Sequence, residues 1–253
     1  AVEFDQSVAS NAFTLGGLSG GGAIVLENNA GTPVAVALSV GNNGQSTEFS
    51  GNLSGAGSLV KIGSGTLTLS GTNSYVGKTA VNAGVLSISS TDALPGWNAG
   101  GRYSVADGAA LAVGHGVADG EIVTILGTGN FASGASVGFD TSDGDRTYGG
   151  AIANTSAGTL GLVKIGAGVL TLSAANTYTG TTSIRGGTLR LGSAAALPSG
   201  RTIAMSGDGT LDLNGYDLTV GNIASSAATN TITDNSGVAG TSTLTISGGA
   251  PAT

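Results

Sequence analysis

The feature that most constrains this chain of 253 residues is an internal repeat. Residues 59–95 read LVKIGSGTLTLSGTNSYVGKTAVNAGVLSISSTDALP, and residues 162–198 read LVKIGAGVLTLSAANTYTGTTSIRGGTLRLGSAAALP. The second copy begins 103 residues after the first and aligns without a gap, with 20 of 37 positions identical. A unit that repeats within one chain usually stacks on copies of itself, so the sequence predicts a solenoid.

The segments between glycines alternate like short strands. Glycine makes up 47 of the 253 residues, and apolar pairs two residues apart flank a small or polar residue. That spacing is typical of a strand with one buried face, and no helical stripe of apolar residues runs far before a glycine interrupts it. We therefore predict a nearly all-β chain. Its apolar pairs are Leu67/Leu69, Leu86/Ile88, Leu111/Val113, Leu170/Leu172, Leu189/Leu191, Leu211/Leu213 and Leu244/Ile246.

The distances between these pairs favour a parallel β-helix. Leu67 precedes Leu86 by 19 residues and Leu170 precedes Leu189 by 19, and the following steps are 25 and 22 residues. One coil of three short strands with their turns takes roughly 20–25 residues. A β-sandwich of hairpins remains an alternative, because Asn-Gly and Asp-Gly pairs such as Asn43-Gly44 and Asp143-Gly144 are hairpin signals.

Charge and cysteine content narrow the class of partner and the compartment. The net charge is −7 and the eight Lys and Arg residues are scattered, so no basic face exists for nucleic acid and we expect no nucleic-acid partner. No run of 18 apolar residues and no signal-peptide pattern occur. The absence of cysteine suits a chain that crosses an oxidising compartment unfolded, where a disulfide would be a hazard.

The repeat resembles the passenger-associated repeat of Gram-negative autotransporters, the proteins of type V secretion. The matching positions of the first copy are Lys61, Gly63, Gly65, Leu67, Leu69, Asn73, Tyr75, Gly77, Thr79, Gly84 and Leu86. The second copy matches at Lys164, Gly166, Gly168, Leu170, Leu172, Asn176, Tyr178, Gly180, Thr182 and Leu189, and departs at Ala174, where the first has Gly71.

The resemblance implies a right-handed parallel β-helix that forms one passenger segment over residues 1–253. It also implies export through the periplasm and outer membrane to the bacterial surface or the medium. The function it implies is that of an adhesin or virulence-factor rod, with a host-cell surface, a matrix component or neighbouring bacterial cells as partners. The family's C-terminal β-barrel translocator, the partner in the full-length protein, is expected to be absent from this chain, which ends STLTISGGAPAT.

The repeat residues have a physical interpretation that does not depend on the family. The Leu pairs are expected to fill the tube, and Asn73 and Asn176 suit corners where a side-chain amide bonds to the backbone of a neighbouring coil. For Tyr75 and Tyr178 we favour core or edge packing over an exposed binding surface. Lys61 and Lys164 are predicted to be solvated charges beside a strand.

The sequence contains few candidates for catalysis, and we expect no catalytic, cofactor-binding or metal-binding residues. Gly17-Leu18-Ser19-Gly20-Gly21 fits the nucleophile-elbow pattern, but one such match is expected by chance at this glycine content and no helix is predicted after it. The single histidine, His115, is predicted to lie in a glycine-flanked turn, with Asp119 four residues on. Asp140, Asp143 and Asp145 have a spacing that suits Ca²⁺, although a polar loop is the simpler interpretation.

Two other functions for a solenoid remain open as alternatives. A polysaccharide-active β-helix enzyme would need several carboxylates in one groove. An ice-binding solenoid would need ranks of Thr-x-Thr, which Thr66/Thr68 and Thr243/Thr245 match only locally. For an adhesin, residues 96–158 between the repeats are the predicted binding region. They hold most of the unusual side chains, namely Trp97, Tyr103, His115, Phe131, Phe139 and Tyr148.

Overall fold

A computed structural model describes residues 2–237 and 242–248. The chain divides into two compact units, residues 1–135 and 136–253. The prediction of a single segment over residues 1–253 stays a prediction. Residues 249–253, the end of the tail STLTISGGAPAT, lie outside the described residues.

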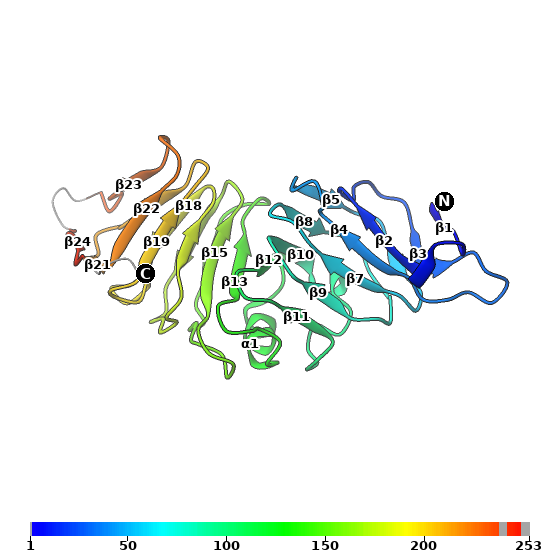
Figure 1. The fold of residues 1–253 in the computed structure, drawn as a ribbon. Coiled ribbons are helices and arrows are strands. Elements are labelled where there is room, and N and C mark those ends of the chain that lie inside the picture. Colours follow the sequence, from blue (N-terminus) through cyan, green and yellow to red (C-terminus); the bar gives the residue numbers. More distant parts are fainter. Residues whose placement is uncertain (1, 238–241, 249–253) are drawn as a thin grey trace. The chain divides into compact units, whose positions relative to one another are not determined.

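The first unit is built from parallel strands that stack coil upon coil (Figure 1). One sheet contains β1 (Val2–Phe4), β3 (Ile24–Asn28) and β6 (Leu53–Ser54). A second contains β2 (Ala12–Leu15), β4 (Ala37–Val40), β7 (Ser58–Lys61), β9 (Thr79–Val81) and β11 (Tyr103–Val105). A third contains β5 (Thr47–Phe49), β8 (Thr66–Leu69), β10 (Val85–Ser90) and β12 (Ala110–Gly116). Two short 3₁₀ turns are η1 (Ala9–Asn11) and η2 (Thr91–Ala93).

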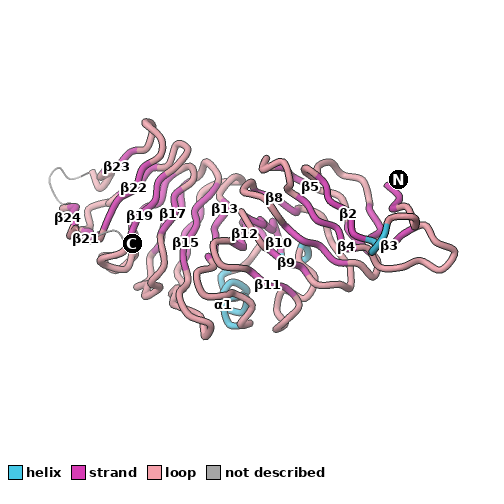
Figure 2. The backbone as a smooth tube through the Cα atoms, in the orientation of Figure 1, coloured by secondary structure: helices cyan, strands magenta, loops and turns pink. Residues whose placement is uncertain are grey.

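The second unit repeats this plan. One sheet contains β13 (Ser136–Asp140), β15 (Gly161–Ile165), β17 (Thr182–Ile184), β19 (Thr202–Met205) and β22 (Asn222–Ser225). A second contains β14 (Arg146–Tyr148), β16 (Val169–Leu172), β18 (Thr188–Leu191), β20 (Thr210–Asp212) and β23 (Thr231–Thr233). β21 (Leu218–Val220) pairs with β24 (Leu244–Ile246). Figure 2 shows how loops join the strands at every corner.

The strand pairing confirms the solenoid and excludes the hairpin sandwich. Each pair of named strands is parallel, and the predicted coil steps appear directly in the register. Leu67 pairs with Leu86, and Leu86 pairs with Leu111. In the second unit Leu170 pairs with Leu189, and Leu189 with Leu211. A sandwich of hairpins would require antiparallel neighbours.

The apolar pairs fill the interior of each unit. Strands such as β8 and β16 alternate between half-buried and buried positions, so Leu67 and Leu69 face inward from β8 as Leu170 and Leu172 do from β16. Leucines stacked from coil to coil exclude water from a continuous core, which supplies most of the stability of such a fold. The last pair differs, since Ile246 of β24 is 55% exposed.

One α-helix interrupts the nearly all-β fold. It is α1 (Asp119–Gly127), which lies in the first unit, and the remaining elements agree with the prediction of a nearly all-β chain. Ile122 and Ile125 are buried three residues apart on its inner face, and Glu121 accepts a 2.8 Å hydrogen bond from the Ala118 N–H at the start of the helix. The hydroxyl of Tyr103 in β11 donates to the Ile125 carbonyl at 3.1 Å and so fixes the helix to the coil. No helix in the described part of the chain has the length and apolar character of a membrane span.

Candidate functional site

The first repeat buries a charged amine at a corner of the coil. Lys61 is 1% exposed and lies in the inward register between Val40 and Val81 of the neighbouring coils. Its Nζ donates to the carbonyl oxygens of Ile62 at 2.7 Å, Gly63 at 2.9 Å and Ala83 at 3.2 Å. Three acceptors match the three donors of an ammonium group, which offsets the cost of burying its charge.

The second repeat builds the same corner. Lys164 is fully buried, and its Nζ donates to the carbonyl oxygens of Ile165 at 3.0 Å, Gly166 at 2.8 Å and Gly186 at 3.0 Å. The prediction that Lys61 and Lys164 are solvated is therefore wrong. Each amine bonds to two carbonyls of its own coil and one of the next, so it fixes the register between coils.

Burial lowers the pKa of both amines but leaves them charged at neutral pH. Burial lowers the pKa of Lys61 to about 8. Burial also lowers the pKa of Lys164 to about 8, although the nearby carboxylates of Asp140 and Asp145 act in the opposite direction. Both amines are therefore protonated at neutral pH, and the carbonyls around them favour that charged form.

Glycines with positive φ make room for these corners. Gly63 has φ 68° and Gly84 has φ 66°, and a Cβ on Gly84 would lie 2.9 Å from the Lys61 Nζ. The second copy has Gly166 at φ 80° and Gly187 at φ 58° in the same places. An L-residue with a side chain rarely adopts this conformation, which explains why these positions of the motif are glycine.

The two asparagines of the motif bridge three coils, as expected for corner residues. Asn73 accepts a hydrogen bond from the Leu53 N–H at 2.7 Å and donates to the Ala93 carbonyl at 2.7 Å. Asn176 is held identically by the backbones of Ile152 and Ala196, again at 2.7 Å. The amide satisfies one donor and one acceptor that a corner would otherwise bury without partners.

The two tyrosines are core residues and not a binding surface. Tyr75 is 1% exposed and its hydroxyl hydrogen-bonds to the Thr79 hydroxyl at 2.5 Å, and Tyr178 is fully buried with its hydroxyl 2.6 Å from that of Thr182. Burial raises the pKa of Tyr75 to about 12. The repeat motif therefore consists of structural residues throughout.

The residues considered for catalysis are not assembled into a site. Ser19 is exposed in a loop followed by strand β3, not in the strand–turn–helix that a nucleophile elbow requires. His115 is exposed within β12 and not in a turn, and Asp119 is the first residue of α1. Among residues 2–237 and 242–248, no three His, Cys, Asp or Glu side chains are arranged to hold a metal ion. Asp140 instead accepts from the Ser142 N–H and hydroxyl, and Asp145 from the Val169 N–H.

Most of the unusual side chains at 96–158 serve the core. Tyr103, Phe131, Phe139 and Tyr148 are each 2% exposed or less. The ring of Phe139 lies 4.9 Å from that of Tyr148, and the ring of Tyr103 lies 6.4 Å from that of Phe131. Only Trp97, half-buried, and His115 reach solvent. The aromatic residues of this region therefore offer little of the accessible surface that a binding loop would need.

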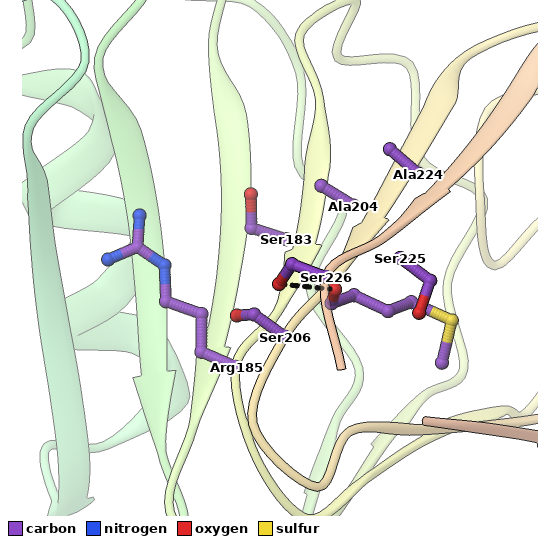
Figure 3. Close-up of a pocket in the computed structure, with 8 residues that line it drawn as sticks. Ser183, Arg185, Ala204, Ser206, Ala224, Ser225 and Ser226 are labelled. Atoms are coloured by element: carbon purple, nitrogen blue, oxygen red, sulfur yellow. Dashed lines mark hydrogen bonds between the residues drawn. The ribbon is translucent and has the colours of Figure 1, made fainter. Parts of the chain in front are cut away.

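An arginine face in the second unit is the surface that the sequence did not single out. Arg185 follows strand β17 and lies between two open hollows of about 300 and 490 Å³. Figure 3 shows it beside Ser183 and Ser206, with Ala204 and Ala224 on the neighbouring strands. Neighbouring atoms lower the pKa of Arg185 by desolvation, but a guanidinium keeps its charge at any physiological pH.

Comparison with known proteins places this architecture in a family. The Passenger-associated-transport-repeat family matches residues 59–88 and 162–191, which contain both lysine corners. The chain is also 33% identical over 226 residues to the Adhesin BmaC autotransporter of Brucella suis biovar 1 (strain 1330), which covers 86% of this chain. The chain is an autotransporter passenger sequence. Passenger sequences are exported, so this one reaches the cell surface or the medium through the outer membrane.

The matched region is a small part of the Brucella protein. The chain spans 6% of the length of the Brucella protein. No solved structure matches the passenger sequence.

Proposed function

We propose that this passenger sequence is an adhesive surface segment, which contacts host cells, matrix components or neighbouring bacterial cells without catalysing a reaction. The observation that carries the proposal is the similarity, over 86% of the chain, to a Brucella protein that is named as an adhesin. The solenoid is consistent with this role because it keeps its side chains on stiff, regularly spaced strands. Export of the passenger makes those strands available to partners outside the cell.

The structure supports a binding role over a catalytic one. The motif residues with polar chemistry, Lys61, Asn73 and their equivalents Lys164 and Asn176, are occupied by the backbone. A polysaccharide-active enzyme would need acid and base side chains held together in a groove. Asp208, the acid that lines the second hollow, is exposed.

Adhesion is tested by coating beads with the purified chain and measuring their retention on epithelial cells, on matrix-coated surfaces and on one another. We expect retention several-fold above beads coated with albumin, on at least one of these surfaces. Beads coated with chain that has been unfolded by heat serve as a second control, because the covalent composition is unchanged. Retention equal to that of albumin beads on all three surfaces would refute the adhesive role.

The absence of catalysis is tested separately. We expect no esterase or glycosidase turnover above the blank, and we expect Ser19→Ala and His115→Ala to leave any background signal unchanged. Reproducible turnover that either substitution abolishes would establish an enzyme instead.

A further inference from the structure

The Arg185 side chain carries a charge that the fold does not use. Within residues 2–237 and 242–248 its guanidinium makes no hydrogen bond or ion pair, whereas Arg190 pairs with Asp212 at 2.8 Å and Arg146 lies 5.7 Å from the centre of the Phe139 ring. Arg201 and Lys78 are also exposed, but neither lines a hollow beside Arg185. A planar guanidinium offers paired donors that match the oxygens of a carboxylate or sulfate.

Two serine hydroxyls beside Arg185 are also unused. Ser183 lies on β17, and Ser206 follows β19, where the backbone bond from the Ser206 N–H to the Ile184 carbonyl at 2.9 Å places it level with Arg185. Neither hydroxyl has a hydrogen-bond partner in the part of the chain that the structure describes. By contrast, the Ser226 hydroxyl on the next coil donates to the Met205 carbonyl at 3.4 Å (Figure 3).

The first hollow has the size and floor of a shallow ligand site. It has a volume of about 300 Å³, at the lower end of the range of about 300–1,000 Å³ found for small-molecule sites. Ala204 and Ala224 pair in register across β19 and β22 and form its low centre, where a larger side chain would stand out from the sheet. Arg185 is the only charged residue of its lining.

The second hollow, of about 490 Å³, lies on the other side of Arg185 and has a glycine floor. Gly166, Gly187 and Gly207 lie on three successive coils along this corner. A Cβ on Gly187 would lie 2.5 Å from the carbonyl oxygens of Gly166 and Gly168, so close stacking of the coils accounts for glycine here. The consequence is exposed backbone that the face of a ligand ring can approach. Asp208 lines this hollow as well, and it repels an anion toward the first hollow.

We propose that the Arg185 face, defined as Ser183, Arg185, Ala204, Ser206, Ala224 and Ser226, binds a saccharide that carries a carboxylate or sulfate group. The guanidinium binds the anionic group, the hydroxyls of Ser183 and Ser206 exchange hydrogen bonds with ring hydroxyls, and the alanine centre contacts the face of the ring. This inference names the partner chemistry for the proposed adhesive function and rests on it.

The net charge of the chain is −7, which bears on how an anionic saccharide could bind. A chain of that charge does not attract polyanions in general, so binding of an anionic glycan requires a local cation with unused donors. One guanidinium and two hydroxyls give a weak single contact. Many copies of the chain on one surface strengthen such contacts by raising the effective concentration of each successive site.

The test measures binding of the purified chain, immobilised at high density, to dextran sulfate, polygalacturonate and neutral dextran. Arg185→Gln removes the proposed contact, and Arg201→Gln is the matched control, because it removes an equal charge from an exposed position outside both hollows. Ala204→Trp fills the first hollow while retaining Arg185. Circular dichroism confirms that each variant is folded.

We expect binding to at least one anionic polymer, none to neutral dextran, and a loss of about tenfold for Arg185→Gln with less than twofold for Arg201→Gln. Ala204→Trp is expected to weaken binding by a similar factor. The two anionic polymers distinguish sulfate from carboxylate as the preferred group. Equal losses for Arg185→Gln and Arg201→Gln, or no binding to either anionic polymer, would overturn the inference.

The same variants separate this inference from the adhesive role. If beads coated with Arg185→Gln adhere to cells as well as the parent, adhesion stands and the Arg185 face is not its site. If the parent binds anionic polymers through Arg185 but adheres to no surface, the site stands and the proposed function fails.

Discussion

The two repeats differ in nearly half of their aligned residues, yet they hold the buried lysine, asparagine and tyrosine of the motif in the same way. Lys61 and Lys164 each bond to three carbonyls, and Asn73 and Asn176 each bridge the coils on either side. The residues that vary between the copies are chiefly those with solvent or loose packing around them. A polar group buried inside the coil must keep its hydrogen-bond partners, because leaving it unpaired would be costly. Its position in the repeat is therefore constrained.

One buried position of the first repeat does vary between the copies: Gly71 in the first repeat corresponds to Ala174 in the second. A Cβ on Gly71 would lie 2.0 Å from the Gly51 carbonyl oxygen of the coil beneath. The second repeat accommodates an alanine there, half-buried. Coils that share a motif can therefore differ in how closely they stack at one corner.

The largest expected effect tests whether the two cores are equivalent. Leu69→Ala and Leu172→Ala each remove a fully buried side chain, and each should lower the free energy of unfolding by about 3–5 kcal/mol. Urea unfolding followed by far-ultraviolet circular dichroism measures the loss, and hydrogen exchange locates it. A severe effect at one site with a neutral effect at the other would show that the repeats are not structurally equivalent.

The lysine corners should come next in magnitude. Lys61→Met and Lys164→Met keep most of the volume but leave three buried carbonyls without donors, which should cost about 3 kcal/mol in each repeat. Lys78→Met, on the surface of the first repeat, is the control and should change the free energy of unfolding by less than about 0.5 kcal/mol. If Lys61→Met were as stable as Lys78→Met, the corner would not depend on its amine.

The glycine corner offers an asymmetric pair of substitutions. Gly71→Ala should destabilise by about 2 kcal/mol because the added methyl group displaces the coil beneath it. Ala174→Gly should cost about 1 kcal/mol or less, mainly through backbone entropy. Thermal unfolding of the two variants against the parent measures both. Equal losses would mean that the two corners stack alike.

The buried lysines also predict a pH dependence with a defined sign. The pKa of each buried lysine is about 8 when folded and 10.5 ordinarily, so between these values the unfolded chain binds more protons and the free energy of unfolding rises with pH. The slope is at most about 1.4 kcal/mol per pH unit for each lysine. Above pH 10 the trend reverses, because burial raises the pKa of Tyr75 to about 12 and the unfolded chain loses that proton first.

Urea titrations at pH 7.5, 9 and 10 measure this dependence. Lys61→Met should remove about half of the rise and Lys164→Met the other half. A parent whose stability is flat from pH 8 to 10 would mean that the carbonyl oxygens hold both pKa values near 10.5.

The sequence was sufficient to predict the coil because leucines at a fixed spacing have one efficient way to be buried together. The prediction for Lys61 was wrong because lysine is usually solvated, although the alternation of the strand indicated that Lys61 faces inward. Lys61 lies two residues after Leu59 on the same strand and therefore on the same, inward face. Alternation outweighed residue type here because the corner supplies three backbone carbonyls, those of Ile62, Gly63 and Ala83, for the amine.

Helix α1 and the Arg185 face could not be predicted from the spacing of apolar residues. Helix α1 rests on Ile122 and Ile125 with glycines on either side, too short a stripe to separate from the surrounding turns. The Arg185 face depends on which strands lie beside β17, because Ser206 and Ser226 are 21 and 41 residues away in the sequence. Only the register of the coils brings these hydroxyls to the guanidinium.

The lysine corners also determine how the folded protein responds to reagents. The sequence has three lysines, and the fold buries Lys61 and Lys164 completely while Lys78 stays exposed. An amine-reactive dye should therefore attach to one side-chain amine of the native passenger, and a protease specific for lysine should find one accessible cleavage site. Unfolding would release the other two, so the ratio of labelling at Lys164 to that at Lys78 reads out, on living bacteria, whether a displayed passenger has finished folding.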